Sequence, residues 1–308
     1  MPLALIYLDT SIWNILAEQT PDEDSLCDHL SKRGAQMTLG LNAYYELLRT
    51  FYGTKPDKMR RGQRLFTCVR RFLRRGVRLL KTWEQLLIEE AEMAPETRSS
   101  IDPFESGEFE KAMTVGAAEL SFGRLDSRLE GMVSRRDAVN SKVIEAASAE
   151  VKSQPELLSD LKEIESDDVS AFLTKASTEE SGRRLLARHL RDLFVDFKRT
   201  APKNCEQLAC SLLKSEVNRT AHALVRVDMY YHWRAAKKPR FSLRNCLAND
   251  AYHVVNASYC RGFVTEDRDG QADAAKQAIP GLKPLIYRDR KVPFSGWLLK
   301  TVADGLVD

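Results

Sequence analysis

The stretch Gly262-Phe-Val-Thr-Glu-Asp-Arg-Asp269 places acids directly behind a short apolar run. The Phe-Val pair predicts a short buried strand, and the glycine in front of it is typical of a helix end. Asp267 and Asp269 follow the carboxyl end of the strand, where open parallel sheets collect their functional groups. In extended chain these two side chains project to the same side, whereas Glu266 is expected to point the other way into solvent. Because adjacent carboxylates repel each other, the stretch predicts a divalent cation and further acids nearby.

The N-terminal part of the chain has the same order of elements. It contains a continuous apolar run, Leu3-Ala-Leu-Ile-Tyr-Leu8, as expected for a central strand of a parallel sheet that is buried on both faces. Asp9 follows at once, and Thr10 or Ser11 is expected to be the N-cap of the next helix. Asp9 is therefore predicted to lie at the same edge of the sheet as Asp267.

Two more acids are expected near this edge. Glu46 lies one turn inside a helix predicted over residues 42–51, and Asp250 lies in the first turn of a helix that Asn249 is expected to cap. His253, on the same face as Asp250, is interpreted as a packed helix residue rather than a general base. Additional elements are predicted from apolar patterns: strands at 36–39, 77–80 and 285–287, and a helix at 271–278.

Charge is unevenly distributed along the chain. The net charge is +6 over residues 1–81, −13 over residues 82–182 and +10 over residues 183–308. An acidic middle segment between two basic segments indicates that the middle segment is a distinct part of the structure. The segment from Lys58 to Lys81 contains ten basic residues and no acid, at spacings that predict an amphipathic helix ended by Gly76.

The middle of the chain reads as helix almost throughout. Helix-forming residues dominate from about residue 83 to residue 238, and five to seven helices are expected there. We therefore predict an α/β fold, an α/β/α sandwich with a parallel, Rossmann-like sheet. Residues 1–81 and 240–308 are expected to form this domain, and residues 82–239 an all-helical insertion domain between its two halves.

Composition excludes several classes of protein. With 43% apolar and 30% charged residues in 308, the chain reads as globular rather than disordered. None of its six cysteines forms a CxxC pair, so the default is a reduced, cytoplasmic protein without a zinc site. The first apolar run is too short for a membrane span and no targeting signal is expected, so no membrane partner is predicted.

Taken together, the acids that follow strands or open helices are expected to converge on one cleft. These are Asp9, Glu46, Asp250, Asp267 and Asp269. Mg²⁺ and Mn²⁺ are hard cations that prefer such oxygen ligands, and pairs of these ions assist phosphodiester hydrolysis.

Each acid also has a purely structural interpretation. Asp9 could cap the helix that follows it, and Glu46 could be a solvated helix residue. Asp250 could interact only with the helix dipole. Asp267 or Asp269 could form an Asx-turn.

Four blocks of the sequence resemble, in order, the motif blocks of the PIN-domain nuclease family, which includes VapC-like toxins. The blocks are Tyr7-Leu-Asp-Thr-Ser-Ile-Trp13, Leu41-Asn-Ala-Tyr-Tyr-Glu46, Asn249-Asp-Ala-Tyr-His-Val254 and Val264-Thr-Glu-Asp-Arg-Asp269. The resemblance implies a Rossmann-like nuclease that cleaves single-stranded or structured RNA with Mg²⁺ or Mn²⁺. It implies catalytic, metal-binding roles for Asp9, Glu46, Asp250 and Asp267, with Asp269 as an additional ligand. The hydroxyls of Thr10, Ser11 and Thr265 are expected to support these acids, and Thr265 matches the family's hydroxyl residue.

The predicted function is thus a metal-dependent endoribonuclease. The large helical insertion departs from the short toxin members, so an antitoxin or another protein partner is an expectation of the family rather than of this sequence. Two alternatives remain open: a non-cleaving module that binds RNA or protein, and a nuclease for structured DNA. The basic segment suits a phosphate backbone or an acidic helix of the insertion. A homo-oligomer is compatible with the sequence.

Overall fold

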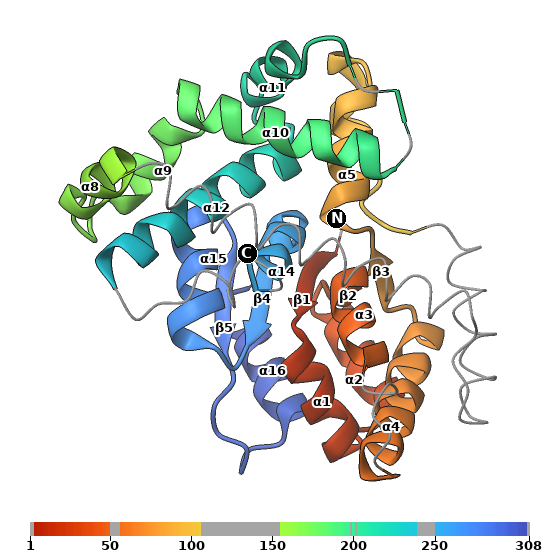
Figure 1. Ribbon diagram of the computed structural model, residues 1–308. Helices are drawn as coiled ribbons and strands as arrows, with labels where there is room; N and C mark the ends of the chain where they lie inside the picture. The colour runs from red at the N-terminus through yellow and green to blue at the C-terminus, as the bar shows by residue number, and fades with distance from the viewer. Residues whose placement is uncertain are drawn as a thin grey trace.

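A parallel β-sheet forms the centre of the computed structural model, which describes residues 3–49, 56–105, 155–197, 199–200, 202–238 and 250–306. The sheet has five strands in the order β3-β2-β1-β4-β5 (Figure 1). The strands are β1 (Ala4–Leu8), β2 (Ala35–Gly40), β3 (Arg78–Leu80), β4 (Gly262–Thr265) and β5 (Lys283–Ile286). Each overlaps a strand predicted from the sequence. The chain therefore has an α/β fold with an all-parallel sheet of the Rossmann-like kind.

The central strand β1 explains the continuous apolar run at the N-terminus. It pairs in parallel with β2 on one side and with β4 on the other. Ile6 and Leu8 pack into the core on one face of the sheet, while Tyr7 packs into the core on the other face. Because alternate residues of a strand face opposite sides, a strand covered on both faces must be apolar throughout.

One face of the sheet is covered mainly by helices from the two ends of the chain (Figure 1). These are α1 (Thr10–Gln19), α2 (Glu23–Lys32), α4 (Pro56–Arg74) and α16 (Phe294–Ala303). Their core side chains include Trp13, Leu26, Phe72 and Phe294. The helix α4 confirms the predicted basic amphipathic helix. The helices α2 and α16 are missing from the sequence-based prediction, although Asp22 caps α2 through its side chain, a signal that could have revealed it.

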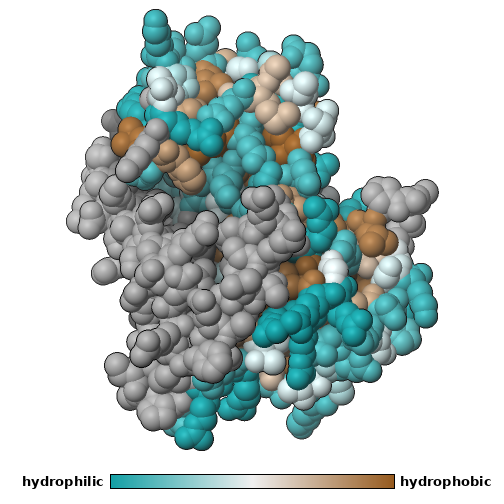
Figure 2. All heavy atoms as spheres, turned by 90° about the vertical axis from the view of Figure 1, so that its right-hand side faces the viewer, coloured by the Kyte–Doolittle hydropathy of each residue, from teal (hydrophilic) through white to brown (hydrophobic). Residues whose placement is uncertain are grey.

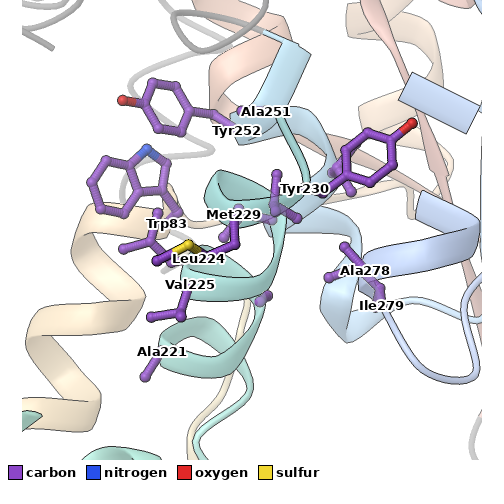
Figure 3. Packing of buried hydrophobic residues seen from close by; sticks show 14 of the residues in the cluster. Trp83, Ala221, Leu224, Val225, Met229, Tyr230, Ala251, Tyr252, Ala278 and Ile279 are labelled. Atoms are coloured by element: carbon purple, nitrogen blue, oxygen red, sulfur yellow. The ribbon is translucent and has the colours of Figure 1, made fainter. Parts of the chain in front are cut away.

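The other face carries helices from both parts of the chain. The helices α14 (Ala251–Asn256) and α15 (Asp273–Ala278) lie on this side, with α15 in contact with β5, and α5 (Trp83–Glu92) and α12 (Arg219–Lys237) pack against these helices. Figure 3 shows their packing, in which the rings of Trp83 and Tyr252 stack with centroids 4.9 Å apart. Further out are η2 (Pro95–Ser100), α8 (Pro155–Glu163), α9 (Val169–Ala176), α10 (Glu180–Asp196) and α11 (Cys205–Leu213).

The predicted insertion shares this core with the sheet. Its described residues are mainly helical, as expected, and one apolar cluster joins Trp83 and Leu224 of this part to Tyr7 and Phe263 of the sheet. The helices of the middle segment are therefore joined to the sheet through one continuous apolar core. The domain boundaries at residues 82 and 239 stay a prediction.

A buried carboxylate holds this layer together. Glu90 of α5 accepts hydrogen bonds from the backbone N–H groups of Thr220 (2.7 Å) and Ala221 (2.9 Å) at the start of α12, and from the hydroxyl of Tyr259 (3.1 Å). Tyr259 belongs to η4 (Ala257–Tyr259), which follows α14. Unpaired N–H groups at the start of a helix need acceptors, so Glu90 connects three elements through one side chain.

Among the described residues, no helix is both long and apolar enough to cross a membrane. The cysteines of this part of the chain, which exclude Cys246, are all free.

Candidate functional site

A cleft of about 410 Å³ opens at the carboxyl end of β1 and β4. It is lined by Asp9, Thr10, Ser11, Glu46, Asp250, His253, Glu266, Asp267 and Gln271. The four acids predicted to be catalytic are all among these residues, although they come from segments as distant as Asp9 and Asp267. No lysine or arginine lines the cleft within the described part of the chain.

Asp9 is buried and serves as the N-cap of α1, so the expectation that Thr10 or Ser11 caps this helix is wrong. Its Oδ1 accepts from the backbone N–H of Ile12 (3.1 Å) and from the Ser11 hydroxyl (2.6 Å). The helix therefore begins one residue earlier than predicted, because the acid behind the strand can itself satisfy the free N–H groups of the first turn. Burial raises the pKa of Asp9, although these hydrogen bonds act in the opposite direction.

Thr265 joins Asp9 to the second strand of the site. The backbone N–H of Asp9 donates to the carbonyl of Val264 (3.1 Å), which sets the two strand ends side by side. The Thr265 hydroxyl then lies 2.6 Å from Asp9 Oδ2 and 2.9 Å from Gln271 Oε1. A hydroxyl has one proton to donate, so it can satisfy only one of these two acceptors at a time. The ionised carboxylate of Asp9 is the stronger acceptor of the two.

Asp250 lies directly before α14, and its carboxylate accepts from Gln271 Nε2 (3.0 Å). Its pKa is raised to about 6, mainly by burial and further by the negative charges of Asp267 and Glu46, while Gln271 and His253 lower it. The acids are therefore close enough to repel one another, as the sequence analysis expected. Asn249, the predicted cap, lies outside the described residues.

Glu46 approaches the cleft from α3 (Leu41–Arg49) and pairs with a buried histidine. Its Oε1 lies 3.3 Å from His253 Nε2, and its Oε2 accepts from the Thr10 hydroxyl (2.5 Å). On the other side of the imidazole, Nδ1 lies 2.8 Å from the Tyr7 hydroxyl. Burial alone would lower the pKa of His253, but the charges of Glu46, Asp9 and Asp250 outweigh it and raise the pKa.

His253 is thus both buried and part of the site. The sequence-based interpretation recognised the burial and missed the contacts, because only the fold brings Tyr7 of β1 and Glu46 of α3 to opposite sides of its ring.

Asp267 follows β4 and caps the π-helical turn η5 (Arg268–Ala272). Its two oxygens accept from the backbone N–H groups of Gly270 (2.8 Å) and Gln271 (3.0 Å), the kind of turn that the structural interpretation foresaw. A Cβ on Gly270 would lie 2.9 Å from Cγ of Asp267, so this close approach requires glycine. Asp269 is exposed and does not line the cleft, in contrast to its predicted role as an additional ligand.

Glu266 also lines the cleft, so the expectation that it points into solvent is wrong. Its side chain is half-buried and accepts two hydrogen bonds from the guanidinium of Arg290, whose Nε and Nη2 lie 3.1 and 2.9 Å from Oε1. The strand ends one residue before Glu266, at Thr265, so the alternation used in the prediction no longer applies.

The donor set fits a hard divalent cation in its chemistry. Five carboxylates line the cleft, the four predicted ligands and Glu266; they can offer oxygen ligands, and His253 is their basic neighbour. Their arrangement is not that of a closed cage: among the described residues no three His, Cys, Asp or Glu side chains are grouped so that they could hold a metal ion. Glu46 turns toward His253 and Thr10, and Asp267 toward the turn that it caps. Binding would therefore require these two side chains to reorient.

Comparison of the chain with protein-family models, with curated proteins and with solved structures gives no match. The resemblance to PIN-domain nucleases consequently stays a prediction that rests on the four sequence blocks.

Proposed function

We propose that this chain is a divalent-metal-dependent phosphodiesterase with a PIN-like fold, most simply an endoribonuclease. One observation carries the proposal: Asp9, Glu46, Asp250 and Asp267 line a single open cleft at the carboxyl edge of a parallel sheet. Burial, reinforced by the negative charges of Asp267 and Glu46, raises the pKa of Asp250 to about 6. Bringing these carboxylates together costs free energy unless a cation lies between them, so a cation-binding role accounts for the cluster.

In this proposal Asp9, Asp250, Asp267 and Glu46 would hold Mg²⁺ or Mn²⁺. The ion supplies Lewis-acid polarisation of a phosphoryl oxygen and a water of lowered pKa. The neighbouring side chains orient the ligands: Thr265 and Ser11 donate to Asp9, and Gln271 donates to Asp250. His253, fixed by Tyr7, holds Glu46 at Oε1 and can keep a proton at Nε2 beside it.

The test measures cleavage of single-stranded RNA, duplex RNA and branched DNA in Mg²⁺ or Mn²⁺, with EDTA as the metal-free condition. We expect RNA cleavage that EDTA abolishes. Asp250→Asn should lower the rate about 10²-fold or more, as for removal of one group that stabilises developing charge. Asp269→Asn is the matched control, since it makes the same change two residues beyond Asp267 but outside the cleft. Full activity of Asp250→Asn, or equal losses in both variants, would reject the assignment, and a preference for branched DNA would change the substrate.

A second candidate is a PIN-like module that binds RNA or a protein without cleaving. It is favoured by the finding that no three acids of the described residues are arranged to hold a metal. Thermal unfolding with Mn²⁺ separates the two, because an ion that binds the native state raises its stability by mass action. A stabilisation that is lost in Asp250→Asn supports the enzyme, whereas the absence of both a shift and cleavage supports the module.

A further inference from the structure

The outer face of α4 forms a groove with α1 that the proposed reaction does not use. The groove measures about 470 Å³, and its walls consist of Thr20, the acid Glu23 of α2, and Arg60, Gln63, Arg64, Thr67 and Arg71 of α4. Leu16, Ala17 and Cys68 form its apolar floor. Figure 2 shows the side of the molecule on which α4 lies, and most of the surface that is drawn in colour there is hydrophilic.

We propose that this groove binds the phosphates of a single-stranded RNA next to the scissile bond, which rests on the proposed function and extends it. Apart from Cys68 in the floor, the lining side chains of α4 are arginine, glutamine and threonine, the residue types that contact phosphate oxygens in nucleic-acid complexes. The groove offers no aromatic ring among its lining residues. Its described lining therefore provides no surface for base stacking, and we expect binding that depends on salt and tolerates many sequences.

Two arginines of the groove carry charge that no described residue neutralises. Arg71 pairs with Glu23 at 3.3 Å. Arg60 and Arg64 are exposed, and neither forms an ion pair or hydrogen bond with another described residue. They lie four residues apart on one helix, about 6 Å along its axis, where like charges destabilise the helix unless an anion lies between them.

The groove begins near the acidic cleft. Arg61 Nη2 donates to Asn14 Oδ1 (3.0 Å), and Asn14 Nδ2 donates to the carbonyl of Thr10 (2.8 Å), a residue of the cleft lining. Farther along, Arg71 of α4 contacts Glu23, so α4 runs in the same direction as the chain from α1 into α2. Leu16 lies about 9 Å beyond Thr10 along α1. A strand whose bond is cleaved in the acidic cleft could therefore place its next phosphates on Arg60 and Arg64.

RNA fits this surface better than the two other candidates. No described residue of the predicted insertion lines the groove, so the structure gives no support for an acidic insertion helix docked there. An acidic peptide would need aromatic or other large apolar side chains as anchor sites for tight binding, and the described part of the floor offers one leucine, one alanine and one cysteine.

The experiment measures binding of a single-stranded RNA oligonucleotide by fluorescence anisotropy in EDTA, over a series of salt concentrations. The test variant is Arg60→Gln/Arg64→Gln. The matched control is Arg184→Gln/Arg191→Gln on α10, which removes the same charge from an exposed site away from the groove. With a slope of about 0.7 per phosphate contact on single strands, losing two contacts should lower the log–log salt slope by about 1.4 and weaken binding about 25-fold at 0.1 M salt.

Cleavage of bis(p-nitrophenyl) phosphate in Mn²⁺ supplies the second readout. This ester is too short to reach the groove, so its rate should be unchanged in Arg60→Gln/Arg64→Gln, while KM for long RNA rises. An unchanged RNA affinity and slope, or an equal effect in the α10 control, would overturn the inference. So would a polyglutamate peptide that binds the wild type as tightly as RNA. If the wild type binds RNA through these arginines but does not cleave it, the proposed reaction alone would be overturned.

Discussion

Replacing Asp9 by asparagine should remove metal-dependent cleavage without destabilising the protein. The side chain is 4% exposed, and burial raises its pKa. Asparagine keeps an oxygen that can accept from Ile12 and Ser11, so the N-cap of α1 survives. The new amide group can donate to the Thr265 hydroxyl, which becomes free to donate to Gln271.

The magnitude follows from these contacts. The Thr265 hydroxyl can donate fully to Gln271, which stabilises the fold by about 1 kcal/mol. About the same free energy is lost because the acceptor at position 9 is no longer charged. The asparagine also avoids the penalty of an ionised buried carboxylate, about 1.4 kcal/mol for each unit by which the pKa is raised. We therefore expect the free energy of unfolding of Asp9→Asn at pH 7 to equal or exceed that of the wild type.

The difference should depend on pH with a defined sign. Between the unfolded pKa of Asp9, about 4, and its raised folded value, the folded state binds more protons, so wild-type stability falls as pH rises. The advantage of Asp9→Asn should thus grow with pH through this window and vanish at lower pH, where Asp9 is protonated in both states.

Urea denaturation in EDTA, followed by tryptophan fluorescence between pH 4 and pH 8, measures this difference. Cleavage assays in Mn²⁺ run alongside, and a loss of about 10²–10³-fold is expected for the variant. A destabilisation of more than about 1 kcal/mol at pH 7 would show that the carboxylate is needed as a structural cap. Wild-type cleavage by a stable Asp9→Asn would refute the metal-ligand role.

Two further predictions concern the scaffold of the site. A Cβ on Gly40 would lie 2.6 Å from Cε2 of Tyr7, so Gly40→Ala should displace the ring that fixes His253. We expect the free energy of unfolding measured by urea denaturation to fall by about 1–3 kcal/mol and RNA cleavage to slow. Unchanged stability and rate would show that Tyr7 moves freely. Glu90→Ala leaves two buried N–H groups without acceptors and should cost at least about 3 kcal/mol. Glu92→Ala on the same helix, which loses only an exposed pair with Arg199, should cost less than about 1 kcal/mol; equal losses would contradict this account.

The accuracy of the sequence-based prediction differed from residue to residue for physical reasons. Asp9 was predictable because it directly follows an apolar run, and Asp267 because it lies two residues past a short strand; acids behind parallel strands meet at one edge of the sheet. Glu266 was misplaced, since strand alternation was extended one residue past the end of β4. Asp269 was included as a ligand on the same argument, but the chain turns into η5 after Asp267, and its side chain is exposed.

The amino-acid sequence by itself determined the local features of this protein: the five strands, the basic helix α4 and the positions of the acids at element ends. These depend on periodicity and on the chemistry of neighbouring residues, which act over a few positions. The tertiary structure alone decided what the acids contact. The pairing of His253 with Tyr7 and Glu46 joins residues more than 200 positions apart, and so does the hydrogen bond of Thr265 to Asp9. Burial, which raises the pKa values of Asp9 and Asp250, is likewise a property of packed layers rather than of any segment.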